Sequence, residues 1–289
     1  MGGAVRTLNG QGVGDPNVVY PAAEGSLTIA GPAAIVSSAS LKVGSVRAGS
    51  ATAGTLRSLA ARGEVTVSDG GQLLSLHRAG QPSTNATGII LAGSKVIVED
   101  TDSAWQSDSG TRIEGALTIR NGGQVTSAFA FIGSGEATGG SGFNGGLGAA
   151  SVAGAGSNLT VSNALFIGSK ANGALTVSDG GKVSANVVYL GHVQAPGVPA
   201  KPGTISVGAG AAQVAASAGT LDIVDDINIG PAGTINFNHT EDDYHFSEGV
   251  ESIAYGQGLI NQINGITLLD GDLDRYTGET HVKGGDVIR

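Results

Sequence analysis

The chain contains no cysteine, one tryptophan and one methionine, and only 4% of its 289 residues are aromatic. The absence of cysteine excludes disulfide cross-links, thiolate metal ligands and catalytic thiols. Basic residues are also few: 15 lysines and arginines stand against 24 aspartates and glutamates, which gives a formal net charge of −9. Because a protein that neutralises phosphates needs a basic stripe, this balance disfavours nucleic acid or an anionic membrane as the partner.

Long apolar stretches are absent too. No run of about 18 apolar residues is available to span a membrane as a helix, and the N-terminus lacks the basic and apolar segments of a secretion signal. If the protein is secreted, we expect the chain to be a mature or trimmed form. Glycine is abundant, with 50 residues, but it follows no Gly-X-Y period, which excludes collagen. A hydrophobic content of 40% disfavours simple disorder.

One frame of eleven residues occurs three times, at residues 63–73, 115–125 and 173–183. Each copy begins with glycine, alternates apolar and polar residues, and reaches Asp or Asn followed by two glycines before a new stretch starts. The alternation predicts a half-buried strand, and the Asp/Asn-Gly-Gly sequence predicts a tight turn whose residues tolerate positive φ. A serial repeat of strand and turn predicts a solenoid.

A second repeat gives the size of one coil. Ile167-Gly168 closes one apolar stretch and Leu190-Gly191 closes the next, which indicates a coil of roughly 20 residues. Helix is disfavoured because no long segment has a 3.6-residue period. We therefore predict an all-β fold: a right-handed parallel β-helix, or solenoid, in a single elongated domain of roughly ten or more coils. Residues 1–24 are expected to form an N-terminal lead-in or cap, and residues 25–289 the repeats.

The tail of the chain supplies four short motifs in order. Residues 233–240 read Gly-Thr-Ile-Asn-Phe-Asn-His-Thr, residues 243–247 Asp-Tyr-His-Phe-Ser, residues 264–269 Asn-Gly-Ile-Thr-Leu-Leu and residues 276–280 Tyr-Thr-Gly-Glu-Thr. Together with the eleven-residue frame and the segment 152–168, these motifs resemble the repeats of passenger domains in bacterial autotransporters. The resemblance covers roughly residues 25–289, and the tail, residues 215–289, is similar to the conserved repeat of that family.

This resemblance implies a right-handed β-helix that is exported across the Gram-negative outer membrane. It also implies that the full-length protein carries its own C-terminal outer-membrane β-barrel as a partner, and the chain is expected to be truncated before any such barrel. The expected location is therefore extracellular, at the bacterial cell surface, with an outer-membrane anchor in the full-length form.

Catalytic and metal-binding residues are not predicted. No serine has glycine at both −2 and +2, as a hydrolase nucleophile elbow requires; Ser141 comes closest, but Phe143 stands at +2. The acidic turn 270–274 begins like a calcium loop without its closing glutamate, and His239 and His245 belong to the tail motifs. Because the few basic residues are scattered, a polysaccharide lyase is disfavoured. We expect a protein that is not an enzyme and needs no cofactor.

The outer surface carries the remaining signal. The residue before the terminal glycine of each coil is Ile, Leu or Val, and this residue and its i−2 partner are predicted to point inward. The inward set is Leu41, Val43, Ala130, Ile132, Leu165, Ile167, Val188, Leu190, Ile227 and Ile229. The neighbours Phe131, Phe166 and Tyr189 must then point outward, as an aromatic ladder on three successive coils. Trp105 occupies the place of Leu159 in the following repeat, which predicts a rung or turn residue.

Two long insertions follow the strand end that carries the ladder. They comprise residues 135–148 and 192–203, and insertions in a solenoid often lie on its binding side. The candidate ligand-binding surface therefore comprises Phe129, Phe131, Phe143, Phe166, Val187, Tyr189 and His192. The alternative interpretation is that the loops fold over the aromatic rings and keep them dry.

We expect a non-enzymatic cell-surface or secreted adhesin or self-association module that displays loops and an aromatic ladder on a rigid β-helix. The expected partner is a host glycan, a matrix protein, or a second copy of the protein on a neighbouring cell. Two alternatives stay open. The chain could be a passive stalk that presents a missing N-terminal domain, or an enzyme of the polysaccharide lyase type.

Because no cluster supplies a complete set of ligands, we predict that the fold does not depend on a metal ion. Addition of EDTA should leave the thermal unfolding midpoint unchanged, as followed by circular dichroism. A fall of many degrees that calcium restores would contradict this prediction.

Overall fold

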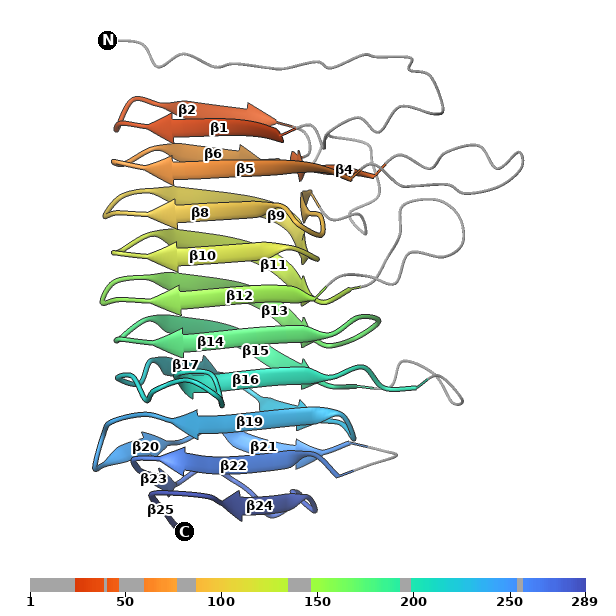
Figure 1. Ribbon diagram of the computed structural model, residues 1–289, viewed down its shortest axis with the longest axis vertical. Helices are drawn as coiled ribbons and strands as arrows, with labels where there is room; N and C mark the ends of the chain where they lie inside the picture. The colour runs from red at the N-terminus through yellow and green to blue at the C-terminus, as the bar shows by residue number, and fades with distance from the viewer. Residues whose placement is uncertain are drawn as a thin grey trace.

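The computed structural model describes residues 24–38, 41–46, 60–76, 87–134, 147–192, 199–253 and 257–289. Within these residues every regular element is a strand, and the strands β1 to β25 are stacked in one column (Figure 1). The predicted all-β class is therefore confirmed. The expected lead-in, residues 1–24, lies outside the described residues apart from Glu24, which begins β1.

The described residues form three sheets. The first contains, in spatial order, β1 (Glu24–Ala30), β5 (Ala60–Ser68), β8 (Lys95–Glu99), β10 (Ala116–Arg120), β12 (Gly148–Ala153), β14 (Gly173–Ser178), β16 (Gly203–Gly208), β19 (Gly233–Asn238), β22 (Leu259–Asn264) and β24 (Glu279–Val282). The second contains β2 (Ile35–Ser38), β6 (Gln72–Ser75), β9 (Ala104–Ile113), β11 (Gln124–Ile132), β13 (Asn158–Ile167), β15 (Lys182–Leu190), β18 (Asp226–Ile229) and β21 (Gly249–Ser252), with β3 (Leu41–Val43), β7 (Gly88–Ile90) and β17 (Thr220–Ile223) joined to it. The third contains β20 (Tyr244–Phe246), β23 (Ile266–Leu269) and β25 (Asp286–Ile288).

Each strand pairs in parallel with the equivalent strand of the next coil. In the first sheet, Leu117 lies opposite Ala150, and Ala150 lies opposite Leu175. The short strand β4 (Ser45–Val46), which pairs antiparallel with β5, is the exception among the described pairs. Neighbouring strands of one sheet are separated in sequence by a strand of the other, so the connectivity is that of a parallel solenoid and is consistent with a parallel β-helix.

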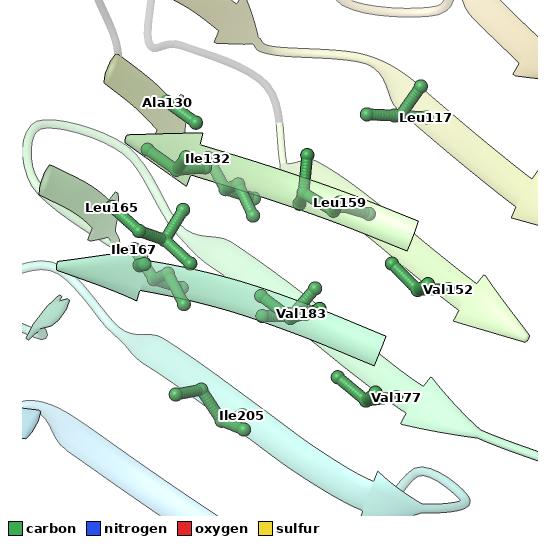
Figure 2. Packing of buried hydrophobic residues seen from close by; sticks show 14 of the residues in the cluster. Leu117, Ala130, Ile132, Val152, Leu159, Leu165, Ile167, Val177, Val183 and Ile205 are labelled. Atoms are coloured by element: carbon green, nitrogen blue, oxygen red, sulfur yellow. The ribbon is translucent and has the colours of Figure 1, made fainter. Parts of the chain in front are cut away.

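The core lies between the first and second sheets. Side chains from both sheets fill this space (Figure 2), among them Ile132 and Ile167 from the second sheet and Val152 and Val177 from the first. All four are fully buried. Burial of one such side chain stabilises the fold by about 1.5–3 kcal/mol, so these aliphatic columns supply most of the favourable free energy.

The predicted inward set is confirmed except at one position. Nine of its members are buried: Val43, Ala130, Ile132, Leu165, Ile167, Val188, Leu190, Ile227 and Ile229. Leu41 is half-buried, because it lies near the N-terminal end of the stack, where fewer coils surround it.

Trp105 is a core residue, as its place in the repeat predicts. It lies opposite Val125, and Val125 lies opposite Leu159 in the next coil. The indole ring is fully buried, and its Nε1 donates a hydrogen bond to Oγ of Ser75 at 3.1 Å. The ring passes so close to Gly88 that a Cβ there would collide with it.

The Asp/Asn-Gly-Gly turns have the predicted positive φ at their first two residues. Asn121 has φ 55° and Gly122 has φ 95°, and the other two copies are similar. The second glycine has a different role. A Cβ on Gly123 would collide with the carbonyl oxygen of Val98 in the preceding coil. A glycine is therefore required at this position by the close contact between coils. The conformation of the turn itself does not require it.

We predict that Gly123→Ala destabilises the coils around β10 and β11 by about 1–3 kcal/mol, because the added methyl group forces the backbone away from Val98. The measurement is urea unfolding followed by circular dichroism. Gly25→Ala in β1 is the matched control, since nothing lies within 4 Å of a Cβ placed there. Equal unfolding midpoints for both variants would mean that the coils can separate without cost.

Candidate functional site

The strongest candidate surface is the aromatic ladder, defined as Phe131, Phe166 and Tyr189. Strands β11, β13 and β15 place these residues directly opposite one another. The inward neighbours on either side are fully buried, which fixes the rings on the outer face of the second sheet. The ring centroids of Phe131 and Phe166 are 4.8 Å apart with an interplanar angle of 4°. Those of Phe166 and Tyr189 are 5.0 Å apart with an angle of 12°.

The stacking decides which part of each ring a partner can touch. Phe166 has a ring on both sides, so its two faces are turned to Phe131 and Tyr189. All three side chains are half-buried. What the ladder offers to solvent is therefore a row of ring edges. Edges carry the positive part of the ring quadrupole and pack well against apolar groups or the faces of other aromatic rings.

His192 continues the ladder beyond Tyr189. The two ring centroids are 5.7 Å apart, with a tilt of 43°. Burial lowers the pKa of His192, so its imidazole is neutral at physiological pH. Its buried Nδ1 has no hydrogen-bond partner in the described part of the chain. The residue therefore acts here as a fourth ring and not as a charge.

The other predicted surface residues have different surroundings. Phe129 is 40% exposed and follows an irregularity in the pairing of β11 with β9. Val187 is half-buried and lies opposite Ala164. Phe143 lies outside the described residues. Of the predicted surface residues, ring contacts bring together four: Phe131, Phe166, Tyr189 and His192.

The ladder spans three coils, and polar or charged residues stand at both of its ends. On the N-terminal side, Phe131 lies opposite Arg112, and Arg112 lies opposite Ile89. On the C-terminal side, Tyr189 lies opposite Asn228, and Asn228 lies opposite Glu251. An apolar strip thus stands between charged or polar positions, which is the pattern of a bounded contact surface.

Both predicted insertions leave the solenoid beside the ladder. One separates the end of β11 from the start of β12, and the other separates the end of β15 from the start of β16. Residues 135–146 and 193–198 of these insertions lie outside the described residues. On this side of the solenoid, strands of the second sheet end and strands of the first sheet begin. We call it the insertion corner.

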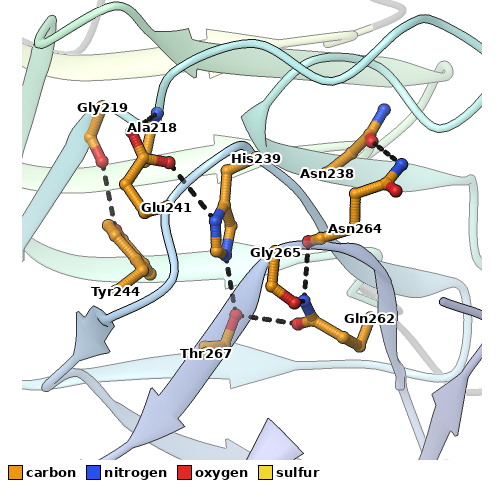
Figure 3. Close-up of polar contacts among 10 residues, drawn as sticks. All are labelled: Ala218, Gly219, Asn238, His239, Glu241, Tyr244, Gln262, Asn264, Gly265 and Thr267. Atoms are coloured by element: carbon orange, nitrogen blue, oxygen red, sulfur yellow. Dashed lines mark hydrogen bonds and ion pairs between the residues drawn. The ribbon is translucent and has the colours of Figure 1, made fainter. Parts of the chain in front are cut away.

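The tail motifs form a buried polar network (Figure 3). His239 is fully buried, and its Nε2 shares a hydrogen bond of 2.8 Å with Oγ1 of Thr267. Its Nδ1 faces Oε2 of Glu241 at 3.3 Å, an ion-pair distance without hydrogen-bond geometry. Thr267 in turn donates to Oε1 of Gln262 at 2.7 Å. A Cβ on Gly265 would collide with the His239 ring, which explains the glycine of this motif.

Three tail side chains bind the backbone of residues 218–223, the segment that contains strand β17, a role that the sequence did not reveal. Strand β17 pairs with β15 on one side and with no strand on the other. Glu241 accepts a hydrogen bond from the amide of Ala218, and Glu248 accepts one from the amide of Ile223, each at 2.9 Å. The Tyr244 hydroxyl donates to the Gly219 carbonyl at 3.1 Å. Burial raises the pKa of Tyr244 and of Glu248, which keeps the tyrosine protonated.

The second tail histidine is exposed. The Nδ1 of His245 contacts Asp270, and its Nε2 lies 3.2 Å from Oδ1 of Asp243. The contact with Asp270 raises the pKa of His245, and Asp243 adds to this effect. In the acidic turn, Oδ1 of Asp272 accepts from the amide of Asp274 at 2.9 Å. No group of three or more His, Asp or Glu residues in the described ranges is arranged to hold a metal ion.

Burial lowers the pKa of His239, so the folded protein keeps this imidazole neutral, whereas it binds a proton below about pH 6.5 in the unfolded chain. The unfolded state thus gains protons on acidification, and the stability contributed by neutral His239 is lost as the pH falls from about 6.5. We expect His239→Gln to reduce the fall in thermal midpoint between about pH 7.5 and about pH 5.

His245→Gln is the matched control. The pKa of His245 is raised, so its contribution is present below about pH 6.5 and is lost as the pH rises. Its removal should therefore cost stability in acid and little at alkaline pH. The assignment of His239 is wrong if His239→Gln keeps the full pH dependence of the wild type.

The described parts of the chain contain no helix, and hence none that is long and apolar enough to cross a membrane. No protein-family model matches the chain, and comparison with curated proteins and with solved structures gives no significant match.

Proposed function

We propose that the chain is a passenger domain of the bacterial autotransporter class and acts at the cell surface as a non-enzymatic adhesin or self-association module. The proposed fold in full is a right-handed parallel β-helix of roughly ten or more coils. Two findings support this proposal. The parallel coils stack as such a fold requires, and the tail motifs 233–240, 243–247 and 264–269 contact one another through His239, Tyr244 and Thr267.

The observation that carries the functional part is the aromatic ladder. Phe131, Phe166 and Tyr189 form a contiguous apolar strip on the outside of a rod with a net charge of −9. Surface strips of this kind mark interaction sites unless another part of the protein covers them. The strip lies on a rigid sheet, so it binds with little loss of conformational entropy.

The exposed ring edges favour one kind of partner among those expected. A glycan that stacks on an aromatic residue needs an open ring face, and the faces inside the ladder are turned to one another. An apolar protein surface can pack against edges. We therefore propose a matrix protein or a second copy of this chain as the partner of the ladder.

A passive stalk is the second candidate, and the same stacking favours it. Each aromatic pair stabilises neighbouring coils by about 0.5–1.5 kcal/mol beyond area burial, whether or not a partner binds. A stalk would need the ladder for rigidity alone. Stability and adhesion must therefore be measured on the same variants.

We predict that the triple substitution Phe131→Ser, Phe166→Ser and Tyr189→Ser reduces aggregation of cells that display the chain, or their adhesion to matrix protein, about tenfold, because the apolar strip is lost. Circular dichroism should show that the variant stays folded, since the core columns are untouched. The measurement is settling of displaying cells together with attachment to immobilised matrix proteins.

The matched control is Thr118→Ala, Ser151→Ala and Thr176→Ala. These residues lie on β10, β12 and β14, in the same coils but on the outer face of the first sheet, and are half-buried like the ladder. The control should adhere as the wild type does. A folded ladder variant with wild-type adhesion and a lower unfolding midpoint would support the stalk and contradict the adhesin.

A further inference from the structure

A groove of about 600 Å³ lies on the outer face of the first sheet, where β1, β5, β8, β10 and β12 begin. Its wall and floor include Ser26, Arg62, Glu64, Lys95, Ala116 and Leu147. This volume is within the usual range of small-molecule sites. The groove shares no residue with the aromatic ladder, which lies on the second sheet.

Two of the few basic residues of this acidic chain line the groove. Arg62 is exposed, and its guanidinium has no ion pair or hydrogen bond within the described ranges. Its Nε lies 3.5 Å from the position of a Cβ on Gly93, so the side chain extends across the glycine and not into the core. The groove thus holds an arginine whose five donors are available to an anion.

Lys95 and Glu64 stand beside Arg62 as a pair. Their charged atoms are 3.0 Å apart, and both side chains are well exposed. An exposed pair of this kind contributes little to stability, since water screens it. It does place a strong donor and a strong acceptor next to each other, which is the arrangement that hydrogen-bonds two neighbouring hydroxyl groups.

The groove lies at the insertion corner. Its lining residues lie in the N-terminal parts of strands of the first sheet or just before them, and Leu147 comes directly before β12, where the insertion after β11 ends. Leu147 is 61% exposed, so the groove also offers an apolar contact for one side of a ring. The corner therefore brings an anion donor, a donor–acceptor pair and an apolar contact to one place.

These groups fit an acidic sugar better than other anions. A nucleic acid needs several cations along its backbone, and here Glu64 offsets one of the two. An extended peptide gains affinity by pairing with a free strand edge, yet β5, β8 and β10 are paired on both sides. A uronate offers a carboxylate for Arg62 and vicinal hydroxyls for Lys95 and Glu64.

We propose that this groove binds a carboxylate-bearing oligosaccharide of two or three sugar units. Arg62 binds the carboxylate through two parallel hydrogen bonds, Lys95 and Glu64 bind hydroxyl groups of the same or the next sugar, and Leu147 packs against a ring. This site is independent of the ladder, so a single rod carries one contact surface for protein and one for acidic glycan.

The experiment is isothermal titration calorimetry of the purified chain in EDTA with two probes, trigalacturonate and a hyaluronan tetrasaccharide, which represent plant and animal sources of uronate. We expect at least one probe to bind and maltotriose, which lacks carboxylates, not to bind. Arg62→Ala should weaken binding about tenfold or more.

Arg120→Ala is the matched control. It removes the same charge from an exposed arginine of β10 that pairs with Glu99 and does not line the groove, so binding should be unchanged. The ladder variant should also bind the sugar as the wild type does, which keeps this test separate from that of the adhesin. The proposal is overturned if neither probe binds, if Arg62→Ala binds like the wild type, or if a triglutamate peptide binds equally well with the same dependence on Arg62.

Discussion

Parallel pairing of each coil with the next is the constraint on which the rest of the molecule depends. Strands in such a stack are about 4.8 Å apart, and each paired residue lies opposite its equivalent in the neighbouring coil. The aliphatic columns of the core follow directly, as does the short distance between Phe131 and Phe166. Each side chain therefore packs in a column with the side chains at the equivalent positions of the neighbouring coils.

The same constraint governs the charged residues. Like charges directly opposite each other would repel, and the structure instead pairs opposite charges between neighbouring coils. Glu64 meets Lys95, Glu99 meets Arg120, and Lys182 meets Asp222, at 2.6 to 3.0 Å. Amides are used in the same way: Nδ2 of Asn261 donates to Oδ1 of Asn236 at 2.9 Å. The few basic residues of this acidic chain are thus paired with carboxylates of neighbouring coils at these three positions.

The sheet arrangement changes in the tail: β15 pairs with both β17 and β18, and a third sheet of β20, β23 and β25 is added. Glu248 accepts from the amide of Ile223 at the end of β17, and Glu241 and Tyr244 bind the backbone of Ala218 and Gly219 just before that strand. Tyr244 belongs to β20 of the third sheet, and Glu241 and Glu248 lie just before and just after that strand in sequence. The tail side chains therefore supply hydrogen-bond partners to backbone groups of residues 218–223 where the sheet arrangement changes.

Much of this architecture could be predicted because the repeat is local. Alternation gave the inward and outward residues, the Asp/Asn-Gly-Gly sequence gave the turns, and repeat alignment placed Trp105 in the core. Features that join different coils could not be predicted. The need for Gly123 depends on Val98 in the preceding coil.

The groove is a second feature that could not be predicted from the sequence, because it also joins different coils. Its lining side chains come from positions as far apart as Ser26 and Leu147, and no local pattern links them. The role of Glu248 likewise depends on the amide of Ile223, which the alternation of apolar and polar residues does not indicate. The periodicity of the sequence predicts the structure of one coil well. The proposed groove at the insertion corner is formed by residues of several coils, so the periodicity does not predict it.

The position of the single tryptophan determines which part of the protein its fluorescence monitors during unfolding. Trp105 is buried in β9, in the N-terminal half of the stack, with its Nε1 bonded to Ser75. A repeat array can lose coils from one end while the others persist, because each coil contacts only its neighbours. Intrinsic indole fluorescence therefore senses the coils around β6, β9 and β11, and fraying of the tail is silent in that signal.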